Sequence, residues 1–254
     1  MKQRLLLLLK IVYWMSPLVF WLFWQIILAN PQELWYLLLA VMVLLVPVSY
    51  EAAGRKRGRR FFFIFLSLGM LLSSFYLFIS FLSSSWQVEI LWLLLLAYIY
   101  RYLFTAYRMS HGGSTDDWRL VSLYGGLLTV FLASTSFFGL LSFLSLSPWP
   151  LLASFIPFVV ASTYSLAYSQ EWLRKSDRWL WPLLSILPLQ IVMMLSLLPL
   201  NYLITGILST LAYYSMINFV RLYSINNLTR RKIQNYAWFT ALSLIIILLT
   251  ARWL

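Results

Sequence analysis

The feature that most constrains this chain is a succession of long apolar stretches, separated by short polar segments, along its 254 residues. A helix that spans a bilayer needs about 20 mostly apolar residues, and these stretches come close to that length. Because lipid offers no hydrogen-bond partners, a spanning segment of this length must satisfy its own backbone as a helix. We therefore expect an all-α integral membrane protein, a polytopic bundle of about nine transmembrane helices.

The loops between the apolar stretches are short. The composition agrees with a membrane protein, because 62% of the residues are hydrophobic and 10% are charged, whereas soluble domains have about 25% charged residues. We expect residues 1–254 to form a single transmembrane domain with no soluble domain. The expected spans are approximately 11–28, 34–50, 61–82, 90–106, 120–146, 149–168, 179–200, 201–220 and 236–251.

Basic residues gather in alternate loops. With these spans, the N-terminus and the second, fourth, sixth and eighth loops share one side, which holds every Lys and Arg except Arg252. Lysine and arginine in short loops stay on the cytoplasmic side. We therefore expect a cytoplasmic N-terminus and an outside C-terminus. A net charge of +12 on so apolar a chain favours anionic lipid over nucleic acid as a partner.

Two of the cytoplasmic loops carry dense basic clusters. Residues 50–60 read YEAAGRKRGRR, and a second basic loop covers residues 221–234. Each basic side chain near an anionic surface adds about 1 kcal/mol of attraction. The simpler alternative is that these charges only set the topology. The candidate residues for contact with lipid or a partner are Arg55, Lys56, Arg57, Arg59, Arg60, Arg230, Arg231 and Lys232.

The longest loop holds the only histidine, His111, followed by Asp116 and Asp117. One histidine with two carboxylates could bind a divalent cation or act on a phosphate headgroup. The spacing matches no metal-site motif. We prefer the alternative in which Ser114 or Thr115 caps the next helix and the aspartates lie in its first turn, where the helix dipole favours them. We assign no catalytic residue, metal or cofactor, and keep this trio as an alternative.

Small residues recur along the stretch 120–146 at steps of 4, 3, 4 and 3, which places them on one helical face. In lipid, small side chains let helices approach closely, so we expect this face to pack inside the bundle or against a partner. Its members are Ser122, Gly126, Thr129, Ala133 and Ser136.

Prolines interrupt the sixth and seventh spans. Proline removes a backbone hydrogen bond and kinks a helix, and broken helices can line cavities. This predicts a cavity between spans six, seven and eight, lined by Pro157, Pro188, Gln190 and Asn218. No ionisable residue lies in the middle of any expected span, which disfavours ion-coupled transport.

These observations favour a non-enzymatic function. The leading hypothesis is a membrane-embedded subunit or scaffold of a larger membrane complex, bound to anionic lipid headgroups and other membrane-protein subunits. One alternative is a transporter or permease for a small apolar or lipid-like substrate, and another is a lipid-modifying enzyme. The absence of cysteine suits a bacterial inner or plasma membrane.

Overall fold

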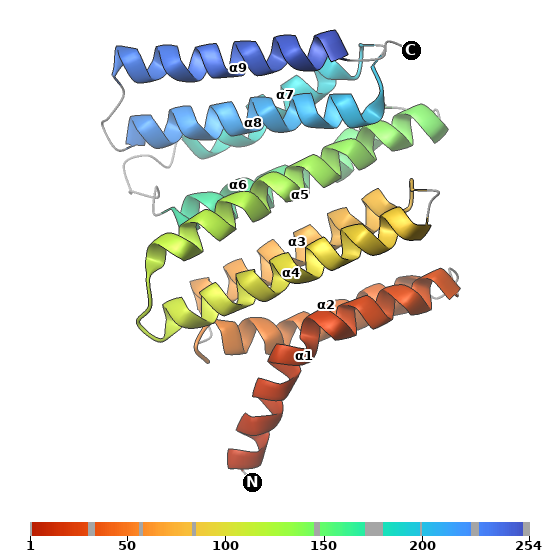
Figure 1. The fold of residues 1–254 in the computed structure, drawn as a ribbon, viewed down its shortest axis with the longest axis vertical. Coiled ribbons are helices and arrows are strands. Elements are labelled where there is room, and N and C mark those ends of the chain that lie inside the picture. Colours follow the sequence, from red (N-terminus) through yellow and green to blue (C-terminus); the bar gives the residue numbers. More distant parts are fainter. Residues whose placement is uncertain are drawn as a thin grey trace. The chain divides into compact units, whose positions relative to one another are not determined.

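The computed structural model describes residues 2–29, 34–55, 58–82, 85–144, 148–170, 180–198, 200–224 and 229–250. Within these residues the chain forms nine α-helices (Figure 1), so the expected all-α class is confirmed. The helices are α1 (Lys2–Ala29), α2 (Leu34–Ala52), α3 (Arg59–Ile79), α4 (Ser85–Ser110), α5 (Thr115–Leu144), α6 (Pro148–Ser169), α7 (Leu180–Leu195), α8 (Tyr202–Ser224) and α9 (Arg230–Thr250).

Six helices in the described part of the chain are long and apolar enough to cross a membrane. The apolar segments are Arg59–Ile79, Trp86–Ser110, Thr115–Phe143, Leu152–Ser169, Tyr202–Tyr223 and Arg230–Thr250. Helices α1, α2 and α7 contain shorter apolar segments, Lys10–Phe23, Leu39–Ala52 and Ile186–Leu195. The protein is thus a polytopic integral membrane protein.

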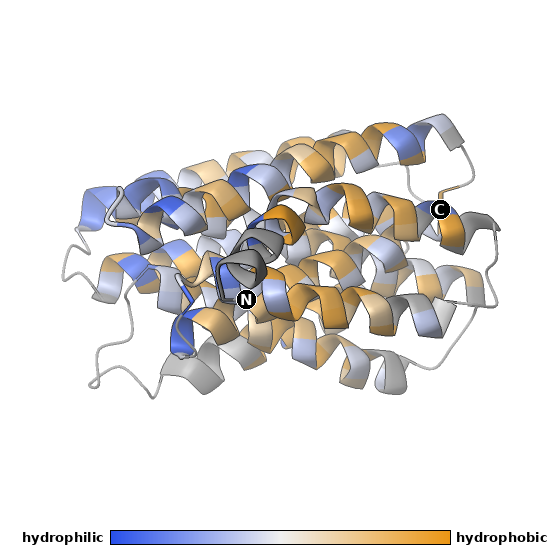
Figure 2. Cartoon of the chain, turned by 90° about the horizontal axis from the view of Figure 1, so that it is seen from below, coloured by the Kyte–Doolittle hydropathy of each residue, from blue (hydrophilic) through white to orange (hydrophobic). Residues whose placement is uncertain are grey.

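The helices depart from the expected spans mainly at their charged ends. Helix α3 begins at Arg59, α4 continues to Ser110, and α9 begins at Arg230, six residues before the expected span at 236. A helix need not end where the hydrocarbon ends, because long basic side chains reach the interface on their aliphatic stems. Hydrophilic residues accordingly lie toward the helix ends, whereas the middle parts are largely hydrophobic (Figure 2).

The chain divides into two compact units. Unit 1 comprises Met1–Gly69 and Leu82–Ser122, and unit 2 comprises Met70–Phe81 and Leu123–Leu254. In unit 1, helices α1, α2 and α4 pack against one another. Tyr13 of α1 and Trp92 of α4 are fully buried there, and the Tyr13 hydroxyl donates to the Leu103 carbonyl. This bond fixes α1 to α4 within unit 1.

Unit 2 is built from consecutive helix pairs, in which α6 packs on α7, α7 on α8, and α8 on α9 (Figure 1). Phe137 of α5, Val159 of α6 and Val192 of α7 share one buried apolar cluster. Val130 and Tyr213 belong to a second cluster, which joins α5 to α8. Helix α9 differs from the others, because none of its residues is buried in the structure.

Candidate functional site

The basic stretch after α2 begins with a glycine-ended helix cap. The Arg55 N–H donates to the Tyr50 carbonyl at 2.9 Å, and the Gly54 N–H donates to the Glu51 carbonyl at 3.0 Å. This pair of bonds requires a left-handed residue just after the helix, and Gly54 supplies it at a φ of 69°. Arg55 also has a positive φ, of 63°, which costs a residue with a Cβ about 1 kcal/mol. The cap therefore holds Arg55 in a defined position.

That position turns the Arg55 guanidinium back onto Glu51. Its Nε and Nη2 atoms donate to the two carboxylate oxygens of Glu51, each at 2.9 Å. Bidentate pairs of this kind are among the stronger hydrogen bonds in proteins. The Glu51 side chain is 2% exposed and that of Arg55 is 34% exposed. The carboxylate raises the pKa of the Arg55 guanidinium, which therefore stays charged.

This ion pair between a buried carboxylate and a partly exposed guanidinium was not predicted from the sequence. The available signal was the spacing, because a glutamate four residues before an arginine suits a pair on one helix face. Of the other basic residues in the stretch, Arg59 is exposed and Arg60 is partly buried. Lys56 and Arg57 lie outside the described residues.

The end of α2 lies against the end of α4. A methyl group on Gly54 would come within 3.1 Å of the Ser110 Cβ. Helix α4 also ends with a left-handed glycine, Gly112, at a φ of 88°. The following N–H, from Gly113, donates to the Arg108 carbonyl at 2.8 Å. Helix α4, which precedes the loop with His111, Asp116 and Asp117, thus ends with a left-handed glycine, as α2 does.

His111 folds back onto α4. Its ring stacks on Tyr107 with the ring centroids 4.1 Å apart. Its Nδ1 atom lies 2.9 Å from the Tyr107 carbonyl oxygen and 3.2 Å from the Ser110 hydroxyl oxygen. Polar side chains at a helix C-terminus commonly satisfy the last carbonyls in this way. These contacts assign His111 a structural role at the C-terminal end of α4.

The two aspartates lie in the first turn of α5. The Ser114 hydroxyl accepts the Asp116 N–H at 3.2 Å, which makes Ser114 the helix cap. Asp116 lies 3.5 Å from the Arg119 guanidinium, and Asp117 lies 3.9 Å from that of Arg108. Within the described residues no group of three His, Asp or Glu side chains is placed to hold a metal ion. The structure does not gather the candidate trio into one cluster.

The small-residue face of α5 is largely enclosed. Ser122 lies in unit 1 and the rest in unit 2. Ser122, Thr129, Ala133 and Ser136 are buried, and Gly126 is partly buried. A methyl group on Gly126 would come within 2.8 Å of the Leu166 side chain of α6. Within unit 2, this face therefore lies close to α6.

The four residues expected to line a cavity differ in exposure. Pro157 and Gln190 are exposed, whereas Pro188 and Asn218 are buried. The Asn218 amide donates to the Tyr214 carbonyl of its own helix at 2.9 Å. Neither of the two cavities described next includes any of these four residues.

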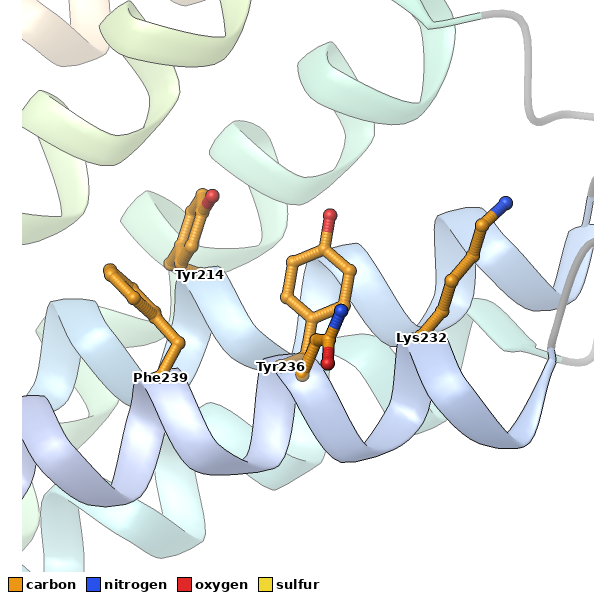
Figure 3. A pocket seen from close by; sticks show the side chains of 5 residues that line it. Tyr214, Lys232, Tyr236 and Phe239 are labelled. Atoms are coloured by element: carbon orange, nitrogen blue, oxygen red, sulfur yellow. The ribbon is translucent and has the colours of Figure 1, made fainter.

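One cavity, of about 30 Å³, is lined by residues of α3, α5 and α6, among them Ser136 and Phe155. The other is an open pocket of about 330 Å³ between α8 and α9. Tyr214 of α8 and four residues of α9 line it: Lys232, Asn235, Tyr236 and Phe239 (Figure 3). Lys232, one of the predicted basic residues, therefore lines a pocket.

The hairpin of α8 and α9 is held together beside this pocket. The Ser215 and Thr240 hydroxyls are hydrogen-bonded at 2.8 Å. The rings of Phe219 and Tyr236 lie 6.4 Å apart. Both contacts hold α9 against α8 beside the pocket.

The basic residues beside the pocket remain accessible. Arg230 and Arg231 are exposed, and Lys232 is partly buried. None of the three forms an ion pair with another residue that the structure describes. Comparison of the chain with known protein families, with curated proteins and with solved structures found no match.

Proposed function

We propose that the protein is a non-enzymatic, membrane-embedded scaffold or subunit that binds anionic lipid at its cytoplasmic surface and packs against other membrane proteins. The observation that carries this proposal is the basic start of α9, where Arg230 and Arg231 are exposed beside an open pocket. Cations at the start of a helix are disfavoured by the helix dipole. Their attraction to anionic headgroups offsets this cost.

The proposed topology has nine crossings, with the N-terminus in the cytoplasm and the C-terminus outside the plasma membrane of a bacterial cell. The basic last turns of α4 and α8, the basic first turns of α3 and α9, and Arg55 just after α2 support it. A reporter fused after Leu254 should report an outside location. The same reporter inserted after Gly58 should report a cytoplasmic one. Finding both on one side would contradict the topology.

Lipid selectivity tests the proposed function. The full chain should be extracted into nanodiscs directly from its membrane, and the lipids retained should be compared with the bulk lipids. We expect enrichment of anionic lipid, and we expect the variant R230Q/R231Q to lose part of it. R101Q removes an exposed but isolated arginine of α4 and serves as the control. A retained lipid composition equal to the bulk in the wild type would contradict the proposal.

A transporter for a lipid-like substrate is the second candidate, and the form of α7 favours it. This helix has only 16 residues, contains Pro188, and is followed by turns at 196–198. Short, interrupted helices line the substrate paths of some transporters. Flux of a labelled lipid across proteoliposomes distinguishes the two candidates, because a scaffold predicts the rate of protein-free vesicles.

A further inference from the structure

We propose that the open pocket between α8 and α9 binds the phosphate headgroup of one anionic phospholipid, with its acyl chains lying along the exposed apolar face of α9. This inference rests on the proposed function, since it names the ligand and the residues that recognise it. The site would be specific and saturable, unlike a diffuse attraction between basic residues and an anionic surface.

The lining of the pocket changes in character along α9. Lys232, Asn235, Tyr236 and Phe239 follow one another at steps of three, one and three residues, so they share one face of the helix. Their spread of seven residues corresponds to about 10 Å along the axis. Cationic and amide groups lie at the start of the helix, and the phenyl ring lies nearly two turns further on. This order matches a molecule with a charged head and an apolar body.

The side chains also point the same way. Figure 3 shows the Lys232 ammonium and the hydroxyls of Tyr214 and Tyr236 projecting to the same side of the hairpin. An ammonium and two hydroxyls offer the donors that phosphate and ester oxygens accept. Lysine, tyrosine and their apolar stems and rings are well suited to the headgroup layer. The volume of about 330 Å³ is in the range of small-molecule sites.

Charge around the pocket favours an anion. Neither α8 nor α9 contains an acidic residue. Arg230 and Arg231 stand next to Lys232 at the positive end of the helix dipole, which further attracts negative charge. A bound phosphate would relieve the repulsion among these three neighbouring cations.

The apolar part of the site favours a lipid over a free phosphate. Phe239 is 54% exposed and Leu242, three residues further along α9, is 59% exposed. A free phosphate ion has no apolar surface to place against them. Acyl chains from the surrounding membrane would cover both, so the lipid uses the whole length of the pocket.

Lipid binding to the purified full chain tests the inference. Native mass spectrometry should count phosphatidylglycerol and, separately, phosphatidylcholine retained after delipidation and titration. We expect saturable retention of one phosphatidylglycerol, lowered about fivefold by K232Q. F239A should weaken phosphatidylglycerol binding also. The matched control is R221Q, which removes an exposed cation of the same hairpin outside the pocket lining, and it should change retention less than twofold.

A competition arm identifies the source of the phosphate. Millimolar glycerol phosphate should leave the bound phosphatidylglycerol in place, and its displacement would point instead to a soluble phosphate ligand and overturn the inference. Equal losses in K232Q and R221Q would also overturn it, because they indicate a diffuse field. If the wild type is enriched in anionic lipid but K232Q retains as much phosphatidylglycerol, the pocket is not the binding site, and the proposed function is still supported. If the wild type shows no enrichment of anionic lipid, the proposed function itself is contradicted.

Discussion

Several basic residues follow α2 in the sequence, several more open α9, and the sequence predicts the same role for both stretches. In the structure Arg55 is bonded to a buried carboxylate, whereas Arg230 and Arg231 are exposed and Lys232 faces an open pocket. A cluster of positive charge in a sequence therefore overstates the charge available to a ligand when an acid lies one helical turn away.

The difference has a local physical cause. At α2 Arg55 follows the helix, where the dipole favours a cation, and Gly54 turns the chain so that Arg55 reaches Glu51. At α9 the basic residues open the helix, where the dipole disfavours them and no acidic residue lies on the same helix. Arg55 is therefore bonded within the fold, whereas Arg230 and Arg231 stay exposed.

The largest effect should come from R55A. It leaves the Glu51 carboxylate buried at 2% exposure without its partner, which should destabilise the protein by about 3 kcal/mol. Unfolding in mixed detergent and SDS micelles, followed by tryptophan fluorescence, measures this. The matched control is R59A in the same stretch, where the side chain is exposed and the expected change is below about 0.5 kcal/mol. Equal destabilisation by R55A and R59A would contradict the structural role of Arg55.

The cap that positions Arg55 can be tested without changing any charge. G54A forces a Cβ into a left-handed φ of 69° and toward Ser110, and it should cost about 1–2 kcal/mol. Gly58 provides the control, because a methyl group there meets nothing within 4 Å. The same unfolding assay should find G58A neutral within about 0.5 kcal/mol. If G58A were the more destabilising variant, the account of the cap would be wrong.

Much of this fold follows from the sequence, because apolar stretches of about 20 residues have the length of membrane-spanning helices, which satisfy their own backbone in lipid. The helix bounds of α2 and α6 lie within two residues of the expected spans. Charged ends were harder to predict, since Arg230 and Lys232 belong to a helix although they are too polar for the hydrocarbon. Hydropathy predicts which residues lie in the hydrocarbon layer, but a helix can continue past the edge of that layer.

The candidate sites were less predictable, because each depends on contacts between distant segments. The close approach of Gly54 to Ser110 joins residues far apart in the chain. The pocket likewise needs Tyr214 of α8 to face Lys232 and Phe239 of α9. Periodicity places residues on the face of one helix, but it does not state which helix that face meets.

A smaller effect should separate the hairpin from the charges at its end. S215A removes the hydrogen bond to Thr240, and bonds between membrane helices are worth about 0.6 kcal/mol on average. Unfolding should therefore shift by about that amount, and phosphatidylglycerol retention should weaken as α9 becomes less well fixed. Unchanged retention together with unchanged stability would show that this bond does not shape the pocket.

The smallest effect on stability should come from R230Q/R231Q. Both side chains are exposed and lie where the helix dipole disfavours cations, so we expect a change within about 0.5 kcal/mol. The same variant should lower anionic lipid enrichment. A destabilisation comparable to that of R55A would mean that the two basic ends serve the fold alike.

The contrast between the two ends is tested most directly by measuring bound phosphatidylglycerol per protein for R55Q and K232Q side by side, by native mass spectrometry of folded protein. We predict that K232Q lowers retention about fivefold, whereas R55Q retains lipid as the wild type does. Equal loss in both variants, or loss in R55Q alone, would contradict the assignment of one basic end to the fold and the other to lipid.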